Sequence, residues 1–204
     1  MSDEVLLTNY FDCLDQELSK WKARANRLVF SQAKEAILSA QQSGARIHVT
    51  GIGKPSHVAQ YIASLFSSTG SPCYVLDGTE AVHGSSGQVV PGDIVIAISN
   101  SGETAELKAT VETLRNNGAY LIAVTGQMHS WLAQNSELCL FAGVEQEGDS
   151  LNKPPRMSII AEILTLQVLS LLLQEAKGLQ PEEYMKWHPG GSLGKTLRKE
   201  LSHE

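Results

Sequence analysis

The segment at residues 99–104 is the part of the sequence best suited to bind an anion. It reads Ser-Asn-Ser-Gly-Glu-Thr, follows an apolar run and precedes a helical pattern. Backbone N–H groups and hydroxyls at a helix N-terminus form a cradle for a phosphate monoester. The residues that would supply side chains are Ser99, Asn100, Ser101 and Thr104. A purely structural alternative stays open, because a hydroxyl residue followed by Glu103 is also a common helix cap.

A second glycine-containing segment, at residues 51–56, also ends an apolar run before a helical pattern. It reads Gly-Ile-Gly-Lys-Pro-Ser, so its glycines let the backbone approach a ligand and Lys54 adds a positive charge. The dinucleotide-binding fingerprint needs a third glycine where Ser56 stands. A nicotinamide nucleotide as the ligand is favoured only by Gly-Ile-Gly and by Asp77, near the end of the next apolar run.

His188 is the strongest single candidate for an acid or a base. It precedes Pro-Gly-Gly, which cannot continue a helix, so the imidazole is presented from a constrained turn. A structural alternative is a histidine that satisfies a buried hydrogen bond. The following Gly-Ser-Leu-Gly-Lys-Thr, residues 191–196, is no phosphate-binding P-loop, because Pro189 occupies the position of its first glycine. We expect Lys195 and Arg198 to serve the last helix or an acidic surface.

Five short apolar runs predict the strands that position these segments. Their apolarity is continuous rather than alternating, which is typical of parallel strands that are covered on both faces. The runs span residues 46–50, 73–76, 93–98, 120–124 and 138–141. We therefore expect a doubly wound α/β fold with a five-stranded parallel sheet, whose ligands bind beyond the carboxyl ends of the strands.

Helical patterns separate and flank these runs. Apolar residues three or four apart predict two helices between residues 2 and 44, with Ser31 as the N-cap of the second and Gly44 at its end. Further helices are predicted at 55–69, 104–117 and 158–176. The last is apolar on most sides, so we expect it to be buried in the core or in a subunit interface.

Composition narrows the class of protein. The chain has 204 residues and suits a single domain. Its net charge of −6 argues against a nucleic-acid-binding protein, and its 3 cysteines argue against a disulfide framework. The acidic N-terminus predicts no secretion signal, and no segment is long and apolar enough to predict a membrane span. We expect a cytoplasmic protein.

Four segments together resemble those of the SIS-domain arabinose-5-phosphate isomerases. They are Ser-Asn-Ser-Gly-Glu-Thr at 99–104, Gly-Ile-Gly-Lys at 51–54, Glu-Ala-Val-His-Gly at 80–84 and His-Pro-Gly-Gly-Ser-Leu-Gly at 188–194. The resemblance implies one SIS domain over residues 1–204, with N-terminal helices at 1–45, an α/β core at 46–178 and a histidine-motif segment at 179–204. It also implies a homo-oligomer, by analogy a tetramer, that needs no metal or cofactor. We expect the regulatory repeats of longer relatives to be absent.

The resemblance assigns roles to individual residues. It implies that the sugar phosphate is bound by residues Gly53, Ser56, Ser99, Asn100, Ser101 and Thr104. It implies that the reacting end is lined by Lys54, His83, Glu103, Glu147 and His188. Aldose–ketose isomerisation passes through an enediol and needs a base beside the carbon and donors beside the oxygens. Glu147 and His188 are both candidates for that base.

Departures from the family pattern leave the sugar open. Pro155, Arg156, Met157 and Ser158 replace a small, hydroxyl-rich segment, which adds bulk and charge near the expected sugar end. Another pentose or hexose phosphate is therefore an alternative substrate. A non-catalytic sugar-phosphate sensor and a nicotinamide-dependent oxidoreductase are the alternatives from other functional classes.

Overall fold

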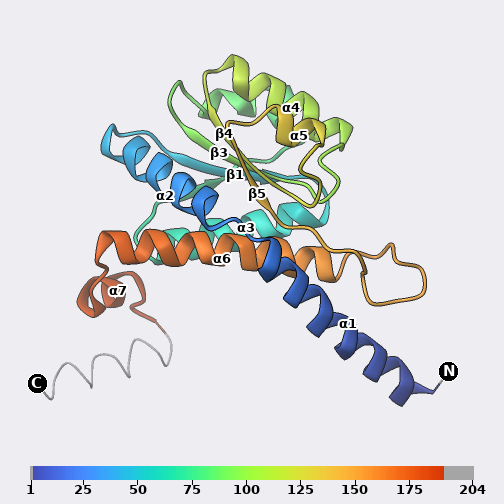
Figure 1. The fold of residues 1–204 in the computed structure, drawn as a ribbon. Helices are drawn as coiled ribbons and strands as arrows, with labels where there is room; N and C mark the ends of the chain where they lie inside the picture. The colour runs from blue at the N-terminus through green and yellow to red at the C-terminus, as the bar shows by residue number, and fades with distance from the viewer. Residues whose placement is uncertain (1, 191–204) are drawn as a thin grey trace, which may run out of the picture.

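The computed structural model describes residues 2–190 and contains the expected five-stranded parallel sheet (Figure 1). The strands are β1 (Ile47–Gly51), β2 (Cys73–Val75), β3 (Ile94–Ile98), β4 (Tyr120–Thr125) and β5 (Leu138–Phe141). They lie in the order β2-β1-β3-β4-β5, and every neighbouring pair is parallel. Each strand boundary lies within one residue of its prediction, because the central strands are buried on both faces and their apolar runs are unbroken.

Helices cover both faces of the sheet. On one face, alternate residues of the strands pack against α2 (Arg27–Gln42), α3 (Lys54–Ser68) and α6 (Met157–Lys177). On the other face, Val95, Ala97, Leu121 and Ala123 pack against α4 (Ala105–Asn116) and α5 (Trp131–Gln134). The structure therefore confirms the doubly wound α/β prediction.

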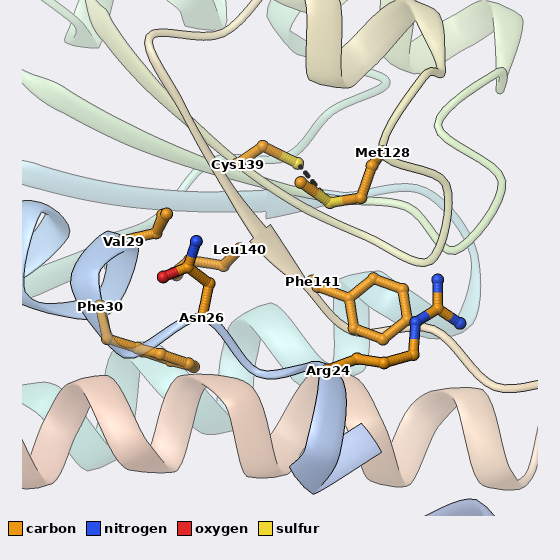
Figure 2. Close-up of a pocket in the computed structure, with 8 residues that line it drawn as sticks. All are labelled: Arg24, Asn26, Val29, Phe30, Met128, Cys139, Leu140 and Phe141. Carbon is orange, nitrogen blue, oxygen red and sulfur yellow. Dashed lines mark hydrogen bonds between the residues drawn. The ribbon is translucent and has the colours of Figure 1, made fainter. Parts of the chain in front are cut away.

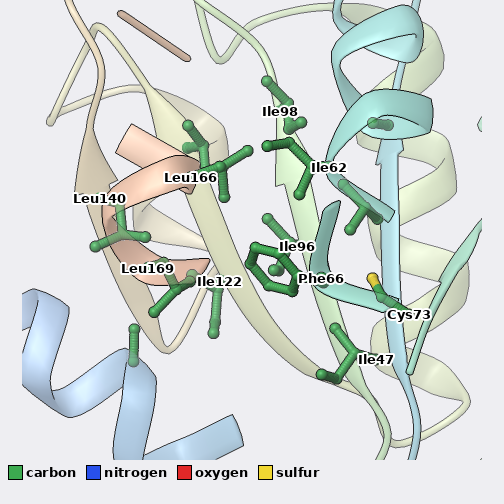
Figure 3. Close-up of a cluster of buried hydrophobic side chains, with 14 of the residues drawn as sticks. Ile47, Ile62, Phe66, Cys73, Ile96, Ile98, Ile122, Leu140, Leu166 and Leu169 are labelled. Carbon is green, nitrogen blue, oxygen red and sulfur yellow. The ribbon is translucent and has the colours of Figure 1, made fainter. Parts of the chain in front are cut away.

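The larger core lies between the sheet and α3 and α6 (Figure 3). Phe66 of α3 and Leu166 of α6 point onto Ile96, Ile98 and the neighbouring strand residues, and all four side chains are fully buried. Burial of one such side chain contributes about 1.5–3 kcal/mol to the free energy of folding. This core fixes where α3 and α6 begin, and both beginnings carry candidate site residues.

Helix α6 runs parallel to α3. Gln167 donates a hydrogen bond to Tyr61 Oη (2.8 Å), and further along both helices Lys177 donates one to the carbonyl of Gly70 (2.7 Å). Because α3 starts at the carboxyl end of β1, the first turn of α6 also lies at the carboxyl edge of the sheet. By length and composition alone α6 could cross a membrane, but half of its most apolar stretch is buried inside the described part of the chain.

The N-terminal helices differ from the prediction in one respect. The N-cap of α2 is Asn26, whose Oδ1 accepts from Leu28 N (3.0 Å), so the assignment of Ser31 was wrong by five residues. Asn26 caps the helix because it follows the break after α1 (Asp3–Arg24). Ser31 lies inside α2, where its hydroxyl donates to a backbone carbonyl of the same helix. Helix α1 extends beyond the body of the domain (Figure 1) and leaves Leu7 and Phe11 more than half exposed.

Two 3-10 helices and a final short helix complete the described chain. The 3-10 helices η1 (Ala81–His83) and η2 (Ser85–Gln88) lie between β2 and β3 and contact α4. Helix α7 (Pro181–Trp187) follows α6. Trp187 of α7 lies against Gly70, where a Cβ atom would come within 3.2 Å of its ring, so α7 sits at the C-terminal end of α3.

Candidate active site at the carboxyl edge of the sheet

Ser99 builds the turn that joins β3 to α4. Its side chain is buried (4% exposed), and its Oγ accepts a hydrogen bond from Gly102 N (3.1 Å) and lies 3.3 Å from Thr104 Oγ1. Ser101 is exposed, and its Oγ accepts from Glu103 N (3.2 Å). Four of the predicted substrate-binding residues, Ser99, Asn100, Ser101 and Thr104, therefore lie in one compact turn at the N-terminus of α4, at the carboxyl edge of the sheet.

Gly102 is required by this turn for two reasons. Its φ of +65° is left-handed, which L side chains rarely adopt. A Cβ atom at this position would also lie 2.1 Å from Ser130 Oγ and 2.5 Å from Ser130 Cβ. The carbonyl of Gly102 accepts from Leu132 N (3.1 Å), so the turn is held against the start of α5.

Residues at the end of β4 hold the turn through hydrogen bonds, a role that was not predicted from the sequence. Thr125 Oγ1 and Gly126 N both donate to the carbonyl of Asn100, at 3.1 and 3.0 Å. A Cβ atom on Gly126 would lie 2.5 Å from Asn100 Oδ1, so glycine lets the two loops touch. The signal in the sequence was the Thr-Gly pair directly after the fourth apolar run.

The capping box, which was the purely structural alternative for this turn, is not formed at Thr104. Thr104 is the N-cap of α4, but its side chain makes no capping hydrogen bond. The Glu103 side chain does not cap the turn either, because its carboxylate accepts hydrogen bonds from Trp131 N (2.7 Å) and from Lys108 Nζ (2.5 Å). The hydrogen bond from Lys108 and then that from Trp131 lower the pKa of Glu103. The first-turn N–H groups of α4 have no partners within the helix, and an anion could bind there.

The loop after β1 lies at the same edge of the sheet. Gly53 is the N-cap of α3 with a φ of +67°, and Ser56 Oγ donates to its carbonyl (2.6 Å). Lys54 is the first residue of α3 and is exposed, and within residues 2–190 its ammonium group has neither an ion pair nor a hydrogen bond. It is therefore available to an anionic ligand.

Glu147 is buried where the connection after β5 reaches the start of α6. Only 7% of it is exposed, and its Oε2 accepts from Arg156 N (2.6 Å) and Ser158 N (3.2 Å). These two N–H donors hold the carboxyl group in place at the N-terminus of α6. Glu145 differs, since its side chain is 60% exposed and pairs with Lys20 on the surface.

The structure places the two candidate histidines on different elements. His83 is exposed on η1, beside α4. His188 is half-buried after α7, stacks on the Tyr184 ring at 3.9 Å between centroids and bonds the Tyr184 carbonyl through Nδ1 (2.8 Å). Because α7 lies at the C-terminal end of α3, His188 lies toward the opposite edge of the sheet within one chain. Residues 191–196 lie outside the described part.

Asp77 serves its own turn. Its Oδ1 accepts from Thr79 N (2.8 Å), Thr79 Oγ1 (2.7 Å) and Glu80 N (3.1 Å). The side-chain bond from Thr79, followed by the backbone bonds, lowers the pKa of Asp77. The residue that would favour a nicotinamide nucleotide is thus occupied in a local turn, which weakens that alternative.

Two hollows near the candidate site differ in character. One is largely apolar and lies between the α1–α2 connection and β5, where the Arg24 guanidinium stands 4.0 Å from the centre of the Phe141 ring (Figure 2). None of the predicted site residues lines it. The other lies between α1 and the connection at 146–150, and residues on both sides of Glu147 in that connection line it. Its lining also includes Asn9, Asp12 and other polar residues.

Comparison with known proteins identifies the fold family. Residues 41–172 match the model of the SIS domain, which is well over half of the chain. The chain belongs to the SIS domain family. The turn at 99–104 and the start of α6 both lie within the matched region of this SIS domain.

Individual relatives of this SIS domain include proteins named for a sugar phosphate. It is 38% identical over 168 residues to the arabinose 5-phosphate isomerase KdsD of Pseudomonas aeruginosa, an alignment that covers 82% of this chain and 51% of that protein. The chain thus spans about half the length of the curated relatives it matches. A solved structure from Escherichia coli CFT073, in complex with arabinose 5-phosphate, is 31% identical with a TM-score of 0.80 and covers 93% of this chain and 100% of its own.

The same fold also occurs outside enzymes. The sugar isomerase domain of the RpiR transcription factor from Sphaerobacter thermophilus is 21% identical with a TM-score of 0.63, and the alignment covers 98% of this chain and 97% of that one. At this identity the likeness concerns the fold alone.

Proposed function

We propose that this SIS domain is an aldose–ketose isomerase that interconverts D-arabinose 5-phosphate and D-ribulose 5-phosphate through an enediol. The observation that carries the proposal is the turn at 99–104, with a buried Ser99 and free helix N–H groups, at the same sheet edge as the buried carboxylate of Glu147. Similarity to KdsD and to a protein bound to arabinose 5-phosphate supports the choice of sugar.

The turn binds the phosphate group in this proposal. The hydroxyls of Ser99, Ser101 and Thr104, the amide of Asn100 and the first N–H groups of α4 surround the phosphate oxygens. Gly53 and Ser56 at the start of α3 form the neighbouring wall. The rest of the sugar then extends toward α6.

Glu147 is the base that the local geometry favours. Proton transfer from the carbon beside the carbonyl requires an ionised carboxylate at pH 7. The two N–H donors on Oε2 orient the group and leave Oε1 for the substrate. His188 stays the alternative base, and it would have to come from a second copy of the chain.

The remaining predicted residues assist this step. Lys54, which is exposed and unpaired within the described residues, stabilises negative charge on the enediolate oxygen. His83 assists ring opening and proton relay. Glu103 is held by Lys108 and Trp131, so we assign it the role of fixing the turn rather than of touching the carbon. Isomerisation through an enediol requires no redox cofactor.

A homo-oligomer completes the site in this proposal. His188 lies toward the far edge of its own sheet, and the apolar residues Leu7 and Phe11 of the projecting α1 are more than half exposed. Burial of these side chains against further copies would stabilise a tetramer and bring His188 of one copy to another's turn. We propose that this assembly works in the cytoplasm.

Isotope exchange tests the proposal. The protein is incubated with phosphorylated pentoses and hexoses in deuterated water, and proton NMR follows deuterium entering at the carbon next to the carbonyl. We expect exchange and interconversion with arabinose 5-phosphate. Glu147→Gln should lower turnover by about 10²-fold or more, while Glu145→Gln, an exposed neighbour, should leave it unchanged.

The sensor is the second candidate, because a transcription factor shares the fold. Binding of a sugar phosphate without any deuterium entry would favour the sensor. Exchange that survives Glu147→Gln but is lost when His188 is replaced would assign the base to His188.

A further inference from the structure

The connection between β5 and α6, residues 142–156, carries Glu147 without forming a helix or a strand. Hydrogen bonds to side chains hold this segment instead. Asn152 makes two of them, because its Oδ1 accepts from Glu147 N (2.6 Å) and its Nδ2 donates to the carbonyl of Glu145 (3.2 Å). One amide group therefore fixes the main chain on both sides of residue 146.

The backbone of Asn152 is itself unusual. Its φ of +49° makes it the one residue other than glycine with a positive φ in the described part of the chain. This left-handed conformation is unfavourable for L residues, although asparagine tolerates it better than most. The Asp149 carboxylate stabilises the turn, since its Oδ1 accepts from Leu151 N and from Asn152 N, both at 2.8 Å. The turn thus places the Asn152 amide group against residues 145–147.

These contacts form a closed circuit through Glu147. The main chain of Glu147 is held by Asn152, and its carboxylate accepts from Arg156 N (2.6 Å). The Arg156 guanidinium pairs with the carboxylate of Asp149, the same group that holds the backbone of Asn152. Both the backbone and the side chain of the proposed base are therefore fixed within residues 147–156.

Helix α1 holds the same segment from its other side. Glu17 is buried (2% exposed), and its Oε2 accepts from Glu145 N (2.7 Å). The ring of Tyr10 covers Gly148, where a Cβ atom would lie 2.8 Å from Tyr10 Cδ2. These contacts fix the residues that flank the base, while the hydrogen bond from Glu147 N itself goes to Asn152.

We infer that Asn152 is a positioning residue for the proposed base: its amide group holds the main chain of Glu147, so that the carboxylate stays in place at the start of α6. This inference rests on the proposed function and adds to it a residue that acts through Glu147. Proton transfer depends steeply on placement, and a shift of about 1 Å can cost about 10²-fold in rate. Loss of the amide group should therefore lower kcat more than it changes KM.

Two substitutions separate the amide group from the backbone conformation. Asn152→Gly permits the left-handed φ and removes the amide, while Asn152→Ala removes the amide and adds the backbone cost. We expect kcat to fall about tenfold in both, with KM within about twofold of the wild type, because the turn at 99–104 is untouched. The melting temperature of the alanine variant should lie about 2–8 °C below that of the glycine variant.

A control and a double substitution complete the kinetic test. Leu151→Ala changes a side chain that is 69% exposed in the same turn, so its kcat should equal that of the wild type. Asn152→Gly added to Glu147→Gln should cost no further activity, because the asparagine acts through the glutamate. A second tenfold loss in that background, or wild-type kcat in Asn152→Gly, would overturn the inference.

Amide hydrogen exchange tests the same contact without substrate. The Glu147 N–H should exchange about tenfold faster in Asn152→Gly than in the wild type, because its acceptor is gone. An unchanged exchange rate would contradict the inference. If the exchange rate rises as expected but the wild type turns over no sugar phosphate, the anchoring of Glu147 stands and the proposed function fails instead.

Discussion

Replacement of Gly102 by alanine tests whether the turn at 99–104 is as tightly built as the structure shows. Alanine at a φ of +65° costs about 1–2 kcal/mol because the left-handed conformation is unfavourable for L residues. Its Cβ would also lie 2.1 Å from Ser130 Oγ, and crowding of this kind in a packed region costs about 1–3 kcal/mol. We expect Gly102→Ala to lower the free energy of unfolding by about 2–5 kcal/mol, measured by urea denaturation.

A matched control isolates the crowding. Gly44 has a φ of +82°, and a Cβ atom added there would meet nothing within 4 Å, so Gly44→Ala carries the backbone cost alone. Adding Ser130→Gly to Gly102→Ala removes the two atoms in closest contact and should recover part of the loss. Equal stability of the Gly102 and Gly44 single variants would refute the reasoning. Gly102→Ala should also abolish the rise in melting temperature caused by a sugar phosphate, which Gly44→Ala should retain.

Three further predictions concern stability. Asp93 is 0% exposed and accepts from Arg46 N (2.8 Å) and Val90 N (3.1 Å), so Asp93→Ala should cost about 2 kcal/mol or more in urea denaturation; a neutral result would contradict these contacts. Phe66→Ala in the larger core should cost about 3–5 kcal/mol by the same measurement, and less than 1 kcal/mol would be incompatible with its full burial. Glu162 of α6 is 0% exposed, and this burial raises its pKa to about 8, so in the native state it holds a proton that the unfolded chain releases near pH 4.5. Stability should therefore fall by about 5 kcal/mol between those values, and Glu162→Gln should remove this fall; identical pH dependence in both proteins would count against a buried Glu162.

Local patterns were enough to predict the α/β layers. The strands of this sheet are buried on both faces, so their apolar runs are continuous, and glycines mark the ends of several helices. The boundary that failed, at Ser31, depended on where α1 breaks before α2. Two helix patterns that follow each other closely give several candidate caps, and tertiary packing decides among them.

The site could be predicted only where its residues are adjacent in the sequence. The turn at 99–104 is local, so its residue types alone indicated an anion cradle. Thr125 and Gly126 support the same turn from another strand. The Thr-Gly pair marks the end of that strand in the sequence, but it does not show which turn the pair contacts. Asn152 was not singled out in the sequence, because its contact with Glu147 depends on how the connection between β5 and α6 turns.

The most direct test of the proposed site is a crystal structure of the protein with arabinose 5-phosphate bound. We predict that the phosphate lies at the N-terminus of α4, within hydrogen-bond reach of Ser99, Ser101 and Thr104, with the carbonyl end of the sugar toward Glu147. A phosphate bound away from that turn, or a sugar that extends away from Glu147, would contradict the central claim.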